Sequence, residues 1–269
     1  MPRGPDTPAG VSTPPRIASL VPSLTELVVA LGLGEHLVAR TGYCIHPAQA
    51  LAGVPKVGGT KDVNLAKLRR LAPTHVLVNV DENRADTVAA LREFVPHIVV
   101  THPCAPADNL ALVEQLRQAF EAVAGVAARA DTLRAEIESE LALTIGSPAA
   151  TADVRVLYLI WHDPWMTVAS DTYISRMLAL IGWRTEPALE GGSSGAARYP
   201  VVRGDEAWLV GVQRVLLSSE PYSFAAGHAA AAQVLCPRAR VQRVDGELLS
   251  WYGARAPAGL RYLRELQRS

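Results

Sequence analysis

Residues 126–144 read VAARADTLRAEIESELALT, and this stretch decides the fold. Its apolar side chains recur at helical spacing, and its charged side chains are expected to face solvent. The apolar set is Ala130, Leu133, Ile137 and Leu141, and the charged set is Arg129, Asp131, Arg134, Glu136, Glu138 and Glu140. With glycine on either side, the pattern predicts one amphipathic helix about 28 Å long at ~1.5 Å per residue. Such a helix can join two lobes as a rigid strut.

Short apolar strands alternate with helices on both sides of this helix. The expected strands are residues 16–21, 37–43, 74–80 and 97–101 before it, and 154–161, 214–219 and 241–245 after it. Alternation of this kind predicts an α/β fold with parallel sheets. Ligands are then expected at the loops that follow the carboxyl ends of the strands.

The same pattern divides the chain. The expected parts are a disordered tail at 1–15, an N-terminal lobe at 16–125, the backbone helix at 126–145 and a C-terminal lobe at 146–269.

Local signals predict three further details. Ser23 and Glu26 have capping-box spacing, Asp171 is expected to cap a helix, and residues 184–203 are expected to form a long exposed loop.

Composition argues against a membrane-spanning protein and against a nucleic-acid-binding protein. The 269 residues carry no net charge, 49% are hydrophobic, and no apolar run approaches the roughly 18 residues of a membrane span. Basic clusters interleaved with aromatic residues are absent from the sequence, which argues against a nucleic-acid partner.

The N-terminal segment MPRGPDTPAGVSTPPR has no apolar core of a secretory signal, so the chain is expected to be cytoplasmic as written, or periplasmic if the start is truncated. A monomer is expected. Cys44, Cys104 and Cys236 are expected to be buried thiols.

The aromatic residues are unevenly distributed. All five Trp follow residue 153, and several aromatic residues come just after predicted strands. These are Trp161, Trp165, Tyr222, Phe224, Trp251 and Tyr252. Flat rings at the mouth of a sheet suit a bulky, partly apolar ligand. Trp183 and Trp208 are instead expected in the core.

Signals for catalysis or metal binding are weak. His46, His162 and His228 lie on loops, but none has a neighbouring ligand at zinc-like spacing. The loop at 58–61, GGTK, lacks the pattern of a phosphate loop, and the segment 218–220, SSE, lacks a nucleophile elbow. We therefore expect no metal site, no intrinsic cofactor and no catalytic residue.

Three segments in order now resemble a known family. They are RIASLVPSLTELVVALGLGEHLVARTGYCIHP at 16–47, VPKVGGTKDVNLAKLRRLAPTHVLV at 54–78 and VLYLIWHDPWMTVASDTYISRMLALIGW at 156–183. Together with the long helix, they resemble the class III, helical-backbone substrate-binding proteins, which serve ABC importers of cobalamin, haem and ferric siderophores. The resemblance implies two Rossmann-like lobes bridged by one rigid helix, with the ligand clamped between them and only small lobe movements on binding.

The resemblance also implies roles for individual residues. Tyr43 would face the ligand from the first lobe, and Tyr199, Arg255 and the loop from Trp161 through His162 to Trp165 would face it from the second. Tyr222, Trp251 and Tyr252 complete the expected ligand-binding set. For docking on a permease, Asp205 and Glu206 are the expected acids of the second lobe, whereas the first lobe has Ala66 where an acid belongs, which weakens that contact.

The sequence therefore favours a non-enzymatic binding protein for a corrinoid or a ferric chelate. A cytosolic enzyme or carrier on the same scaffold, using His46, His162 or Glu220 to process such a ligand, stays open as an alternative. A third alternative is a regulatory module that binds a protein partner.

Overall fold

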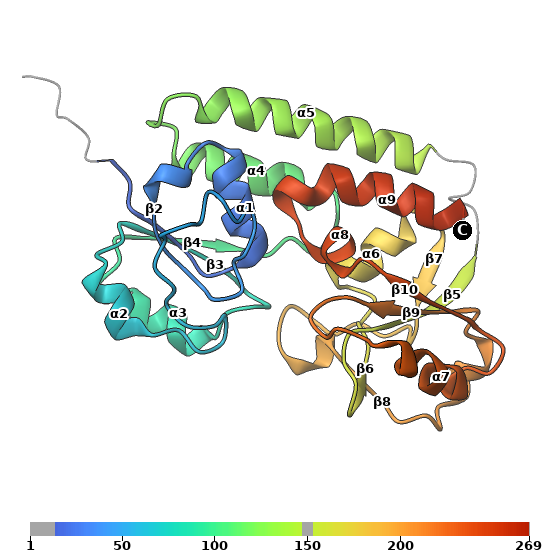
Figure 1. The fold of residues 1–269 in the computed structure, drawn as a ribbon. Helices are drawn as coiled ribbons and strands as arrows, with labels where there is room; N and C mark the ends of the chain where they lie inside the picture. The colour runs from blue at the N-terminus through green and yellow to red at the C-terminus, as the bar shows by residue number, and fades with distance from the viewer. Residues whose placement is uncertain (1–13, 147–152, 269) are drawn as a thin grey trace, which may run out of the picture.

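The computed structural model describes residues 14–146 and 153–268, and it contains two lobes, each built on a parallel four-stranded sheet (Figure 1). The strand orders are β2-β1-β3-β4 in the first lobe and β10-β9-β5-β7 in the second. The predicted α/β class with two parallel sheets is confirmed. The predicted disordered tail lies almost wholly outside the described residues.

The elements follow one another in regular alternation. The strands are β1 Ile17–Ser19, β2 Leu37–Arg40, β3 His75–Asn79, β4 His97–Thr101, β5 Val154–Leu159, β6 Trp165–Met166, β7 Trp183–Thr185, β8 Val201–Val202, β9 Arg214–Ser218 and β10 Arg240–Val244. The helices are α1 Pro22–Ala30, α2 Leu65–Arg70, α3 Ala85–Leu91, α4 Asp108–Ala119, α5 Val126–Ile145, α6 Tyr173–Ala179, α7 Ala226–Leu235, α8 Gly246–Ser250 and α9 Ala256–Arg268. Short 3₁₀ turns include η3 Ala196–Arg198, η4 Ala207–Gly211 and η5 Gly253–Arg255. Across the described ranges, no helix is both long and apolar enough to cross a membrane.

Each sheet is covered on both faces, as its apolar strands require. In the first lobe, Leu68 of α2 and Leu91 of α3 pack with Val76 and Val78 of β3 on one face. The opposite face of this sheet belongs to a much larger core that runs without interruption into the second lobe. That shared core joins Leu77 of β3 to side chains of α1, α4, α5, α6 and α9 and to Tyr158 of β5. The two lobes therefore share one apolar interior.

Helix α5 lies across the outside of the molecule, over α4 and α9 (Figure 1). Ile137 and Leu141 are buried beneath it, as the helical periodicity predicts. The prediction that its charged residues all face solvent is wrong for two of them. Arg134 pairs with Glu114 of α4 at 3.2 Å, and Glu140 accepts hydrogen bonds from Arg261 (2.8 Å) and Arg264 (2.5 Å) of α9. The polar face of α5 thus fastens it to both lobes.

A second junction between the lobes lies where η5 meets α1. The backbone N–H of Gly253 donates to Asn109 Oδ1 of α4 at 2.6 Å. Gly253 has a φ of 79°, and a Cβ there would meet the Leu27 side chain at 3.0 Å. This position therefore needs a glycine for its backbone conformation and for the close approach of the lobes.

Three local predictions are wrong in detail. Val21 is the N-cap of α1, and no capping box forms, because the helix begins at Pro22 and Ser23 lies inside its first turn. Glu26 instead pairs across the lobes with Arg255. Thr172 caps α6, while Asp171 accepts from the backbone N–H groups of Gly191 and Gly192.

The segment 184–203 is not simply an exposed loop. It contains part of β7, the turn η3 and the strand β8, and its Arg198 is buried between the lobes. The reason is that carboxylates from both lobes compensate the buried charge.

We expect Glu140→Ala to lower the free energy of unfolding by about 1–3 kcal/mol, since it removes charge-assisted hydrogen bonds at a half-buried site. Glu138→Ala is the matched control, because Glu138 is exposed on the same helix, and it should change stability by no more than about 0.5 kcal/mol. Urea denaturation measures both values. Equal losses in the two variants would show that the contacts of α5 with α9 do not stabilise the molecule.

Candidate ligand-binding cleft

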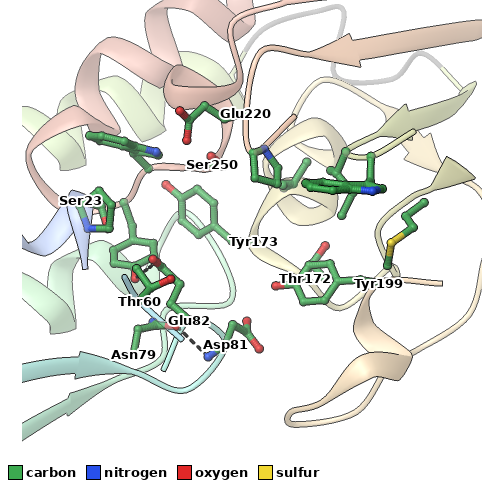
Figure 2. Close-up of a pocket in the computed structure, with 18 of the residues that line it drawn as sticks. Ser23, Thr60, Asn79, Asp81, Glu82, Thr172, Tyr173, Tyr199, Glu220 and Ser250 are labelled. Atoms are coloured by element: carbon green, nitrogen blue, oxygen red, sulfur yellow. Dashed lines mark hydrogen bonds between the residues drawn. The ribbon is translucent and has the colours of Figure 1, made fainter. Parts of the chain in front are cut away.

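A cavity of about 430 Å³ lies between the lobes. Its walls come from segments that follow the carboxyl ends of β1, β2, β3, β5 and β9, together with the end of α8 (Figure 2). This position is the one expected for a ligand site in parallel α/β lobes. Its volume lies within the range of about 300–1,000 Å³ that is usual for small-molecule pockets.

The wall from the first lobe is polar. Asn79 is the last residue of the buried strand β3, Asp81 and Glu82 follow it, and Thr60 and Lys61 approach from the loop after β2. The Asp81 N–H donates to Asn79 Oδ1 at 2.8 Å, and Lys61 Nζ donates to the Asp81 carbonyl oxygen at 2.6 Å. These bonds fix the turn that directs both carboxylates toward the space between the lobes.

The wall from the second lobe is mainly aromatic and aliphatic. Ile160 and Trp161 follow β5, and Trp251 and Tyr252 follow α8. Trp251 is buried, whereas the Trp161 side chain is 41% exposed at the mouth of the cleft. A flat ligand can therefore be held between ring faces and solvent can still reach it.

Glu82 and Tyr252 join the two walls. The Tyr252 hydroxyl donates to Glu82 Oε1 at 2.9 Å. Burial raises the pKa of Glu82 to about 7, with the Tyr252 hydrogen bond and the Lys61 charge acting in the opposite direction. Burial, followed by the charge of Glu82, also raises the pKa of Tyr252 well above its usual value. The carboxyl group of Glu82 thus changes charge near neutral pH.

Behind the cleft, Arg198 forms a buried link between the lobes. Its side chain is only 2% exposed, and its Nε lies 2.9 Å from Asp81 Oδ1. Asp171 approaches the same guanidinium at 3.7 Å, and the Gly192 carbonyl accepts from it at 2.7 Å. Since these partners surround it, Arg198 holds the lobes together and presents little charge to the cleft.

Arg255 belongs to a second ionic cluster, beside the cleft. It donates to Glu26 of the first lobe at 2.6 Å and to Glu247 at 2.5 Å, and its guanidinium stacks 4.7 Å from the Trp251 ring centre. His46 lies 3.4 Å from Glu247. The cluster therefore positions Trp251, and Arg255 itself does not line the described cavity.

The structure brings four of the nine predicted ligand-binding residues together around the cavity: Trp161, Tyr199, Trp251 and Tyr252. Tyr43 is 65% exposed on the first lobe, against Gly59, which precedes two cavity residues. His162, Trp165 and Tyr222 form a cluster of rings with Phe224 and His228 beside Trp161. That any of the nine contacts a ligand stays a prediction.

The residues predicted for permease docking lie elsewhere. Asp205 is exposed, while Glu206 accepts from the backbone N–H groups of Arg203 and Gly204 at 2.8 Å each, so its carboxylate shapes its own loop. Ala66 is exposed on α2. Among the described residues, no group of three or more His, Cys, Asp or Glu side chains could hold a metal ion.

Sequence reasoning missed the carboxylates of the first-lobe wall. Asp81 and Glu82 come shortly after the buried strand β3, separated from it by Val80, and an acidic pair at that place was the available signal. Glu220, which follows β9, was considered only for catalysis, and it also lines the cavity.

Curated relatives share part of this sequence. The vitamin B12-binding protein of Vibrio vulnificus (strain YJ016) is 27% identical over 214 residues, which cover 80% of this chain and 72% of that protein. The vitamin B12-binding protein of Photorhabdus laumondii is 26% identical over 176 residues, 64% of this chain, and the match spans 61% of that relative's length.

Solved structures share the whole fold. The periplasmic vitamin B12 binding protein BtuF of Vibrio cholerae superimposes with a TM-score of 0.75 at 21% identity, covering 95% of this chain and 99% of that one. The periplasmic haem-binding protein RhuT from Roseiflexus sp. RS-1 gives 0.74 at 21% identity, covering 95% and 97%. The family model described as periplasmic binding protein matches residues 17–198. The fold, with two parallel-sheet lobes and a cleft between them, agrees with this family match. The chain therefore belongs to the periplasmic binding protein family, a family of binding proteins and not of enzymes.

Proposed function

We propose that this chain is the substrate-binding protein of an ABC importer and that its ligand is a corrinoid or another metal chelate. The observation that carries the proposal is the cleft between the lobes, with aromatic rings of the second lobe opposite a polar wall of the first. The names of the relatives support it, since they are described as binding vitamin B12 or haem. All of these ligands are flat or compact chelates with apolar faces and polar edges.

The ring faces supply most of the affinity in this proposal. Trp161 and Trp251 stack on the ligand, while Tyr199 and Tyr252 border it with hydroxyl groups. Tyr43, His162, Trp165 and Tyr222 contact those parts of a large ligand that extend beyond the 430 Å³ cavity. Arg255 acts on the ligand indirectly, through the ring of Trp251.

Binding needs only small movements of the lobes. The shared apolar core, the Arg198–Asp81 pair and the Arg255–Glu26 pair all cross the junction, so a wide opening would expose apolar surface and separate buried charges. The ligand is therefore held in a largely preformed cleft.

Delivery to a permease completes the proposed role. Asp205 is the exposed acid of the second lobe, and Glu206 supports its loop. Because the first lobe offers Ala66, docking depends more on the second lobe. The solved relatives are described as periplasmic, and we place the transport role of this chain in that compartment.

Titration of the purified protein with cyanocobalamin, haem and a ferric tris-catecholate tests the proposal. We expect at least one of them to bind at one site per chain with a dissociation constant at or below the micromolar range, and the bound ligand to quench Trp fluorescence. Recovery of the ligand unchanged after incubation, checked by mass spectrometry, separates a receptor from an enzyme. Dissociation constants above a millimolar for all three would overturn the proposal.

We expect Trp161→Leu to weaken binding of the preferred chelate about tenfold, equivalent to about 1.4 kcal/mol, because a stacking face is lost. Trp208→Leu is the matched control, since Trp208 packs in the second lobe outside the cleft. Isothermal titration calorimetry measures both affinities independently of the lost fluorophore. Equal affinities in the two variants would exclude Trp161 from the binding site.

A further inference from the structure

The charges around the cleft are unbalanced. Three carboxylates line it: Asp81 and Glu82 from the first lobe and Glu220 from the second (Figure 2). Among the described residues lining the cavity, Lys61 is the only Lys or Arg. A ligand in the cleft therefore meets more negative than positive side chains.

The arginines near the cleft are already paired with carboxylates. Lys61 Nζ donates to the Asp81 carbonyl oxygen at 2.6 Å, which is a hydrogen bond to a neutral group and not an ion pair. Arg198 is buried against Asp81 and Asp171, and Arg255 is bound between Glu26 and Glu247. An anionic ligand would have to break one of these pairs to obtain a guanidinium, and Lys61 is the one other lysine or arginine that the described lining offers.

Asp81 is neutralised by Arg198, which leaves Glu82 and Glu220 as the carboxyl groups that act on a ligand. The Tyr252 hydroxyl donates a hydrogen bond to Glu82 Oε1. Because a carboxylate can accept several hydrogen bonds through its two oxygens, Glu82 can also accept one from a ligand. The two glutamates belong to opposite lobes, so they border the same ligand from two sides.

From this arrangement we propose that the cleft selects chelates whose edges carry hydrogen-bond donors, namely an amide-bearing corrinoid, and rejects chelates whose edges carry carboxylates or catecholates. The inference rests on the proposed function and narrows its ligand class. Side-chain amides present N–H donors that match the two glutamates. Free carboxylates on the same macrocycle place like charges next to Glu82 and Glu220, and Lys61 is the one lysine or arginine of the described lining that offsets this repulsion.

A matched pair of ligands tests the inference. Cobinamide carries amide side chains on the corrin ring, and cobyrinic acid carries free carboxylates on the same ring. At pH 8 we expect the wild-type protein to bind cobinamide at least 100-fold more tightly than cobyrinic acid, measured by calorimetry. In the variant Glu82→Gln/Glu220→Gln we expect this ratio to fall at least tenfold, chiefly through tighter binding of cobyrinic acid.

A control variant and a stability measurement accompany the test. Glu190→Gln changes an exposed carboxylate of the second lobe outside the cleft and should leave the ratio unchanged. Thermal denaturation confirms that each variant is folded. Glu82→Gln and Glu220→Gln measured singly keep the test valid if the double variant does not fold.

The pH supplies a second readout. The pKa of Glu82 is raised to about 7 by burial, and Tyr252, Lys61, Asp81 and Glu220 are the other groups that influence it. Burial, followed by the charge of Glu247, raises the pKa of Glu220 as well. Because Glu82 gains a proton as the pH falls from 8 to 6, the preference for cobinamide should shrink in the wild type. It should shrink less in Glu82→Gln.

The outcomes are distinguishable. If neither corrin binds, and haem and the ferric catecholate also fail, the proposed function is wrong. If cobyrinic acid, haem or the catecholate binds as tightly as cobinamide, or if the glutamine variants leave the ratio unchanged, the receptor proposal stands and the selection by Glu82 and Glu220 is wrong.

Discussion

One apolar core that crosses the junction between the lobes is the constraint on which the rest of the structure depends. Side chains of α1, α4, α5 and α9 pack into a single interior together with Leu77 of the first sheet and Tyr158 of the second. Because separating the lobes would expose this interior to water, the shared core holds the two sheets against each other. The loops at the carboxyl ends of the strands then face each other across a gap, and that gap is the cleft.

Ion pairs hold the lobes together in addition to the shared core. Glu140 fastens α5 to α9, Arg198 joins Asp81 across the lobes, and Arg255 joins Glu26. These ion pairs also affect which ligands the cleft can bind. With the arginines near the cleft bound to carboxylates of the protein, no such cation is left for an anionic ligand, while Glu82 and Glu220 still border the space. The pairs that stabilise the closed arrangement thus also set the charge of the binding site.

Much of the fold could be predicted because it depends on local patterns. The strand β4 was predicted at its observed bounds, and β3 and β9 within a residue, since continuous apolar runs identify buried parallel strands. The missed helices and strands are α3, α8, β6, β7 and β8, which span between two and seven residues and carry little periodicity. Of the expected site, Trp161, Tyr199, Trp251 and Tyr252 line the cavity, whereas Arg255 is taken up by an ion pair that links positions 229 residues apart in the sequence.

By itself, the sequence determined the α/β class, the long helix at 126–145 and the concentration of aromatic residues in the second half, because periodicity and residue type act over short distances along the chain. Only the tertiary structure decided which charges meet. Asp81 with Arg198, Glu82 with Tyr252 and Glu26 with Arg255 are pairs separated by more than 100 residues, and nothing in the local pattern of either partner specifies the other. Packing of the two lobes on a common core brings these groups together, and so it decides which of them remain to meet a ligand.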